Sequence, residues 1–215
     1  MSEDYYSYNK SFFKRWVSLY DTLTAPVSRL RETVVDFTNA EKGARVLDVA
    51  TGTGKQAFAF ARRGYEVTAV DLSEDMLRVA RKNNVYANII FEAGDATALR
   101  FEDGSFDVVC ISFGLHEMPA GVMKKAIDEI ARVASQKGSI IVVDYTLPSN
   151  KIWRWFAYHI VKSYESKYYP EFIRYDLEIL LRNAGIEIRD KKAVYGGMVT
   201  IFKGAGNLYI KKEAI

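Results

Sequence analysis

The chain has 215 residues, of which 49% are hydrophobic, and a formal net charge of +3. This length is typical of one domain with one core, and the weak charge without a basic run argues against nucleic acid as a partner. With no signal-peptide pattern and no apolar run of about 18 residues, we expect a cytoplasmic chain. Either a monomer or a homodimer is expected. The single cysteine, Cys110, lies in an apolar run and is expected to be a buried thiol.

Strand-like and helix-like segments alternate from Arg45 onward. The expected strands are 45–50, 66–72, 87–95, 106–114 and 139–146, and the expected helices between them are 55–64, 73–83 and 120–138. A further helix is expected around 174–184, followed by strands at 186–195 and 198–206 that Gly196 and Gly197 join as an antiparallel hairpin. The β-then-α order predicts an α/β fold with a Rossmann-like, doubly wound parallel sheet.

Two segments rich in aromatic and basic residues lie outside this alternation, at 1–44 and 147–172. We expect them to be helical lids on a single domain that spans 1–215. Each has an aromatic or apolar stripe at helical spacing: Phe12, Phe13, Trp16, Leu19 and Tyr20 in the first, and Trp153, Phe156, Ile160 and Tyr164 in the second. Inward packing that closes a pocket is the favoured interpretation, and peripheral membrane contact is the alternative.

The turn in "VLDVATGTGKQAF" (46–58) has the strand–glycine–helix pattern of a ligand-binding loop. It does not match a P-loop, because Gln56 follows Gly54-Lys55. Gly52, Gly54 and Ala57 loosely satisfy a dinucleotide fingerprint with Asp71 as the acid, so an NAD-dependent oxidoreductase is one alternative.

Three further features favour an adenosine that carries a free amino acid. Asp48 lies inside the first strand, where a buried acid needs a partner such as the amides of the turn or an ammonium group. Asp95 ends the third strand, and Phe113 follows the fourth. Ligands of open α/β sheets bind beyond the carboxyl ends of the strands, where these side chains would gather with Asp71.

These stretches carry a family resemblance. "LDVATGTG", "VTAVDLSEDML", "GDATAL" and "FDVVCISFGLHEM" resemble the successive motifs of the class I S-adenosylmethionine-dependent methyltransferases, and the chain is similar to their UbiE-like, quinone C-methyltransferase branch. The resemblance covers about 20–204 and includes Tyr20-Asp21 and the closing "GGMVTIFKG". It implies a seven-stranded sheet with the order 3-2-1-4-5-7-6 and an antiparallel strand 7, and S-adenosyl-L-methionine as the cofactor.

The resemblance also implies the residues that hold the cofactor. Asp71 would chelate the ribose hydroxyls, and Asp95 would accept from the adenine amino group. The full set of implied cofactor-binding residues is Tyr20, Asp48, Ala50, Thr51, Gly52, Gly54, Asp71, Leu72, Met76, Gly94, Asp95, Ala96, Ser112 and Phe113.

His116, which follows the fourth strand, is the best candidate for a general base, with a pocket-shaping histidine as the alternative. Asp144 and Tyr145, at the end of the fifth strand, are expected to face the same cavity. Glu117 is as easily an exposed residue, His159 is expected in the core or on the surface, and no metal site is expected because no Cys/His cluster has metal-ligand spacing.

The sequence therefore predicts methyl transfer to a lipophilic or aromatic small molecule, with a menaquinol or ubiquinol precursor as the first candidate. N-methylation of a lipid amine or another small amine is the near alternative. A protein that senses the cofactor without catalysis is a third possibility.

Overall fold

The computed structural model describes residues 5–8 and 28–206. Residues 5–8 form a helical turn. The strands are β1 (Arg45–Val49), β2 (Glu66–Asp71), β3 (Ile89–Ala93), β4 (Phe106–Ser112), β5 (Ala134–Tyr145), β6 (Ile186–Val194) and β7 (Val199–Gly206). The α-helices are α2 (Ser28–Thr38), α3 (Lys55–Arg62), α4 (Glu74–Asn83), α5 (Ala120–Val133), α6 (Lys151–Lys162), α7 (Tyr169–Phe172) and α8 (Leu177–Asn183). The structure also has two 3₁₀ turns, η2 (Leu115–Glu117) and η3 (Tyr195–Gly197).

All seven strands form one sheet with the order β3-β2-β1-β4-β5-β7-β6. The strands from β1 to β5 pair in parallel, and β7 is antiparallel to both β5 and β6. The predicted fold and strand order are therefore confirmed, including the hairpin at the sheet edge. Gly196 and Gly197 make its turn with φ angles of 65° and 88°, a region that favours glycine.

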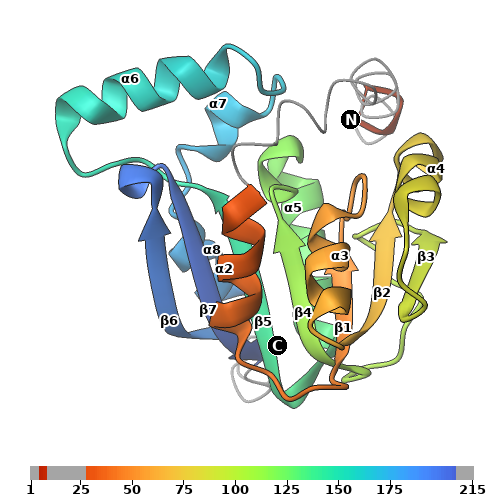
Figure 1. Ribbon diagram of the computed structural model, residues 1–215. Coiled ribbons are helices and arrows are strands. Elements are labelled where there is room, and N and C mark those ends of the chain that lie inside the picture. The colour runs from red at the N-terminus through yellow and green to blue at the C-terminus, as the bar shows by residue number, and fades with distance from the viewer. Residues whose placement is uncertain (1–4, 9–27, 207–215) are drawn as a thin grey trace.

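Helices cover both faces of the sheet (Figure 1). On one face α2 and α3 pack with residues such as Val34 and Phe60 against the central strands, and on the other α5 and α8 pack with residues such as Ile127 and Leu181. The central strand β4 reads FDVVCIS and is buried on both sides, with Cys110 fully buried as expected. None of the described helices is long and apolar enough to cross a membrane.

The ends of the strands explain where a site can form. In Figure 1 α6, α7 and residues 5–8 lie beyond the carboxyl ends of the parallel strands, which is where open α/β sheets bind their ligands. Helix α4 begins there at its N-cap Ser73, whose hydroxyl accepts from the amide of Met76, with Glu74 and Asp75 in the first turn. Helix α6 begins at Asn150, whose side chain accepts from two amides.

Two expectations about helices differ from the structure, and one expectation falls outside the described residues. The helix predicted at 120–138 ends at Val133, because Ala134 is already extended and pairs with Phe106 at the start of β5. Residues 28–38 do not belong to a lid, since α2 packs against the sheet. Tyr20 and the stripe from Phe12 to Tyr20 lie outside the described residues.

The second aromatic stripe does not pack inward as predicted. The four side chains of Trp153, Phe156, Ile160 and Tyr164 are 40–50% exposed, and only Ala157 and Val161 of α6 are buried. The inward face of α6 therefore consists of small side chains, while its large aromatic and apolar side chains face outward.

Candidate active site

A cavity opens at the carboxyl ends of β1, β2 and β4, at the point where the strand order reverses from β1. Nine of the predicted cofactor residues line it: Ala50, Gly52, Asp71, Leu72, Met76, Gly94, Asp95, Ala96 and Phe113. These residues come from segments that are far apart in sequence, and the parallel strands bring them together.

The backbone is strained at two points on the cavity wall. Ala50 and Phe113, the residues that follow β1 and β4, have φ angles of 55° and 56°, which side chains other than glycine rarely adopt. A Cβ on Gly114 would lie 3.0 Å from that of Ala50, so the two loops approach each other closely. Strain of this kind persists where the surrounding structure imposes it, and it concentrates at functional sites.

Asp71 organises the glycine turn from the end of β2. One carboxylate oxygen accepts from the amide of Gly52 at 2.8 Å, and the other accepts from the amide of Ser73 at 2.8 Å. Burial raises the pKa of Asp71, and these two amide hydrogen bonds oppose the increase. Each carboxylate oxygen keeps a second lone pair, so Asp71 can still accept from a pair of ligand hydroxyls.

Asp95 follows β3 and lines the same cavity as Asp71. One oxygen accepts from both the amide and the hydroxyl of Thr97 at 2.8 Å, and the other accepts from the Tyr6 hydroxyl at 2.6 Å. Tyr5, the neighbour of Tyr6, is buried and lines the cavity. Residues 5–8 therefore cover the cavity on the side of Asp95.

Four predicted cofactor residues do not line the cavity. Asp48 is 1% exposed, and its carboxylate accepts from the Thr51 hydroxyl at 2.6 Å. Burial raises the pKa of Asp48 to about 7, while hydrogen bonds from Thr51 and from the amide of Ala57 lower it. Gly54 is the N-cap of α3 with φ 79°, and Ser112 ends β4. Asp48, Thr51, Gly54 and Ser112 therefore support the cavity from behind and do not form its surface.

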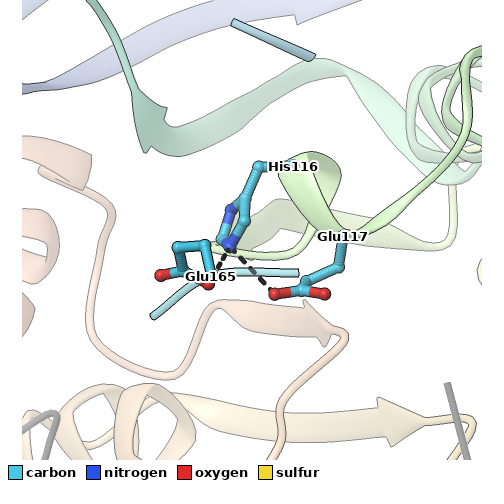
Figure 2. A group of neighbouring side chains, drawn as sticks. All are labelled: His116, Glu117 and Glu165. Atoms are coloured by element: carbon cyan, nitrogen blue, oxygen red, sulfur yellow. Dashed lines mark hydrogen bonds and ion pairs between the residues drawn. The ribbon is translucent and has the colours of Figure 1, made fainter. Parts of the chain in front are cut away.

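His116 lies in η2 and joins a cluster of carboxylates (Figure 2). Its Nδ1 is 2.7 Å from Asp144, and its Nε2 is 3.1 Å from Glu165 and 3.2 Å from Glu117. Asp144 is fully buried and also accepts from the amides of Leu115, His116 and Tyr145. The Tyr145 hydroxyl donates to Glu165 at 2.7 Å.

This arrangement changes the predicted roles. Asp144 and Tyr145 were expected to face the cavity, but neither lines it: the oxygens of Asp144 accept from His116 and backbone amides, and the Tyr145 hydroxyl donates to Glu165. Both ring nitrogens of His116 face carboxylates, so neither is open to a substrate. Glu117 is not an exposed residue, since it is 7% exposed and lines the cavity. His159 is exposed on α6.

The charges in the cluster shift each other's pKa values. Burial lowers the pKa of His116, but the charges of Asp144 and Glu165 outweigh burial and hold it well above its usual value. Burial raises the pKa of Glu117. Burial also opposes ionisation of Glu165, yet the charge of His116 brings its pKa down to about 2. Of these groups, Glu117 lines the cavity, and the others lie behind it.

Sequence reasoning missed several residues of the site. Tyr5, Val70, Thr97, Gly114, Glu117, Met118 and Val122 line the cavity, and Glu165 joins the cluster. Glu117 is adjacent to His116 and could have been included on that ground. Glu165 lies 49 residues away in the connection between α6 and α7, and no local pattern marks it.

Comparison with known proteins shows similarity to methyltransferases. Residues 46–138 match the family model of a methyltransferase domain. Over 121 residues, 56% of this chain, it is 45% identical to the demethylmenaquinone methyltransferase of Renibacterium salmoninarum, of which the match covers 49%. It is also 27% identical over 210 residues to the ubiquinone/menaquinone biosynthesis C-methyltransferase UbiE of Idiomarina loihiensis, covering 86% of this chain and 83% of that protein. Residues 46–138 therefore resemble a methyltransferase domain, and the chain is similar to demethylmenaquinone methyltransferases and to UbiE.

The fold of this chain agrees with that of a solved structure. The methyltransferase bound to the Trm112 activator of Haloferax volcanii superposes with a TM-score of 0.72 at 18% identity, over 92% of this chain and 97% of that one. At this identity the likeness concerns the fold alone. The chain matches only about half the length of the first demethylmenaquinone methyltransferases to which it is similar.

Proposed function

We propose that this methyltransferase moves a methyl group from S-adenosylmethionine to a ring carbon of a lipophilic quinol precursor. The observation that carries the proposal is the cavity in which Asp71, Asp95 and Phe113 meet at the reversal of the strand order. Two carboxylates suit the hydroxyls and the amino group of an adenosine, and the apolar wall suits a ring. The names of the relatives, demethylmenaquinone methyltransferase and UbiE, support a quinone acceptor.

We propose the following residues for the cofactor. Asp71 accepts from the ribose hydroxyls with the lone pairs that Gly52 and Ser73 leave open. Asp95 accepts from the adenine amino group, and the apolar side chains of Leu72 and Met76 pack beside the adenine. Asp48 and Thr51 act indirectly, because they hold the turn that carries Gly52.

The reaction is an in-line displacement. The protein positions the acceptor against the methyl group and excludes water. When bound, S-adenosylmethionine would supply the methyl group to the ring carbon, and the electron pair of the broken methyl–sulfur bond would leave with S-adenosylhomocysteine. A ring hydroxyl ionises beforehand to make the ring electron-rich, and its proton passes to Glu117, which lines the cavity. The ring carbon would then release its own proton while the ring oxygen takes one up, which restores the aromatic hydroxyl and leaves one proton on Glu117. In this scheme His116 and Asp144 are positioning residues, and Tyr145 orients Glu165.

The exposed face of α6 fits delivery of such an acceptor from a membrane. Trp153, Trp155, Phe156 and Ile160 are 40–58% exposed. The helix also carries Lys151, Arg154 and Lys162 and no acidic residue. Aromatic side chains with basic neighbours favour the interface of an anionic lipid surface. We therefore propose peripheral contact of α6 with such a surface.

Sedimentation with vesicles that contain anionic lipid tests the membrane contact. We expect the protein to pellet with these vesicles and a Trp155→Ser variant to pellet less. An Ile179→Ser variant, changed at an exposed residue of α8, is the matched control and should behave as the parent protein. Equal sedimentation of the Trp155 and Ile179 variants would contradict a role for α6.

The function itself is tested with methyl-labelled S-adenosylmethionine and demethylmenaquinol in detergent, with phosphatidylethanolamine as the amine acceptor in parallel. We expect label in the quinol, on carbon, and none in the lipid amine. Label in the amine alone would replace C-methylation with the N-methylation alternative. Transfer to neither, by protein that binds S-adenosylhomocysteine, would refute both acceptors.

A further inference from the structure

Three potential ligand atoms converge in the cluster drawn in Figure 2. They are Nε2 of His116 and one carboxylate oxygen each of Glu117 and Glu165, and all lie within 4.8 Å of one another. His116 and Glu117 come from η2, whereas Glu165 comes from the connection between α6 and α7. His116 is 2% and Glu117 7% exposed, and the side chain of Glu165 is 15% exposed. The three side chains thus form a compact and largely buried donor set.

Asp144 fixes the orientation of the imidazole. Besides Nδ1 of His116 at 2.7 Å, it accepts from the amides of Leu115, His116 and Tyr145. A carboxylate held by three amides is an acceptor in a fixed position, so Nδ1 carries the hydrogen. When a metal ion replaces the proton on Nε2, the lone pair of Nε2 is directed toward Glu117 and Glu165. A histidine whose other nitrogen donates to a buried carboxylate is the usual arrangement in metal sites.

The charge of the cluster favours a cation. Among the described residues, His116 is the one basic side chain that pairs with the carboxylates of Glu117, Glu165 and Asp144. Buried carboxylates in excess of cations are costly. A divalent cation on a neutral imidazole would give both glutamates one shared positive centre.

The two distances from Nε2 to the glutamate oxygens fit a bound ion. Zinc lies about 2.0–2.1 Å from histidine nitrogen and carboxylate oxygen, so two ligands at an angle of about 100–110° are about 3.1–3.4 Å apart. The distances of Nε2 to Glu165 and Glu117, 3.1 and 3.2 Å, fall in this interval. One imidazole and two carboxylates suit zinc or manganese better than magnesium, which prefers six oxygens.

We propose that His116, Glu117 and Glu165 bind a divalent first-row transition metal ion, with Asp144 holding the histidine. Three protein ligands leave at least one position open, as in catalytic metal sites. Glu117 also lines the cavity, so the open site lies next to the proposed cofactor pocket. If the proposed function holds, an acceptor hydroxyl would ionise on the ion, which deepens that proposal; metal binding itself does not depend on it.

The experiment is a calorimetric titration of the full chain, freed of metal with a chelator and dialysed, with Zn²⁺ and separately with Mn²⁺. We expect one equivalent of at least one of these ions to bind with micromolar affinity or better. Glu165→Gln and Glu117→Gln should each weaken binding at least tenfold. Glu171→Gln is the matched control, because the Glu171 carboxylate accepts only from the Tyr175 hydroxyl among the described residues, and this variant should bind as the parent does.

Thermal unfolding followed by circular dichroism shows whether each variant is folded. A visible absorption spectrum of the Co²⁺-loaded chain that is lost in Glu117→Gln and kept in Glu171→Gln gives a second readout. Failure of both ions to bind the parent chain, or equal binding by all three variants, would overturn the proposal and leave a cluster held together by protons. Because S-adenosylhomocysteine is titrated separately, loss of metal binding is distinguishable from failure of the cofactor site.

Discussion

Replacement of Asp48 by asparagine should remove a pH dependence from the stability of this protein. Asp48 is buried in β1, and burial raises its pKa to about 7 from an ordinary 3.8. Between these values the folded chain holds a proton that the unfolded chain has lost. The free energy of unfolding must therefore fall as pH rises from about 4 to about 7.

The magnitude follows from the two pKa values. A difference of about three pH units, at 1.36 kcal/mol each, amounts to about 4 kcal/mol. An asparagine side chain at this position would keep the shape of the aspartate without its charge, and the Thr51 hydroxyl can turn to accept from the asparagine amide. The variant should lack this contribution.

Urea unfolding of the parent and Asp48→Asn, at several pH values from about 4 to 8, measures the effect. The free energy of unfolding of the parent, minus that of the variant, should decrease by about 4 kcal/mol across this range. Taking the difference cancels the groups that both proteins share. A difference that stays constant within about 1 kcal/mol would refute the burial argument.

Three further substitutions test other parts of the structure. Asp71→Ala should weaken S-adenosylhomocysteine binding at least tenfold, about 1.4 kcal/mol, in a calorimetric titration; unchanged affinity would show that the cofactor lies elsewhere. Gly54→Ala should destabilise the fold by more than about 1 kcal/mol, because its φ is 79° and a Cβ would lie 3.1 Å from Ala80 and Phe91; an unfolding midpoint equal to that of the parent would contradict the strain. Arg132→Ala should cost about 2 kcal/mol, since its guanidinium donates to two carbonyls of the 99–101 loop at 2.7 and 2.9 Å; a loss below about 0.5 kcal/mol in urea unfolding would show that these bonds contribute little.

The fold was predictable because local signals and the global pattern agree. Alternating strands and helices, Ser73 as an N-cap and the Gly196-Gly197 turn each act over a few residues. The end of α5 was not predictable in this way. Residues 134–138 have no strand pattern of their own, and their extended form depends on pairing of Ala134 with Phe106 in a distant strand.

In the site, too, residues marked by local signals were predictable, and residues placed by contacts distant in sequence were not. Asp71 and Asp95 follow strands whose ends converge in any such sheet, so their place on the cavity wall was predictable. Glu165 was not, because its contact with His116 depends on how the connection after α6 folds back over the sheet. The outward orientation of Trp155 and Phe156 could not be predicted from the helical spacing of apolar residues either, because this spacing does not show which face of the helix packs against the protein.

The central claim is that the Gly52–Gly54 turn, Asp71 and Asp95 form a pocket for S-adenosylmethionine. Calorimetric titration of the purified chain with S-adenosylhomocysteine, with NADH in parallel, tests it most directly. The account predicts micromolar binding of S-adenosylhomocysteine and none of NADH. Binding of NADH alone would mean that the turn holds a dinucleotide, and would contradict the account.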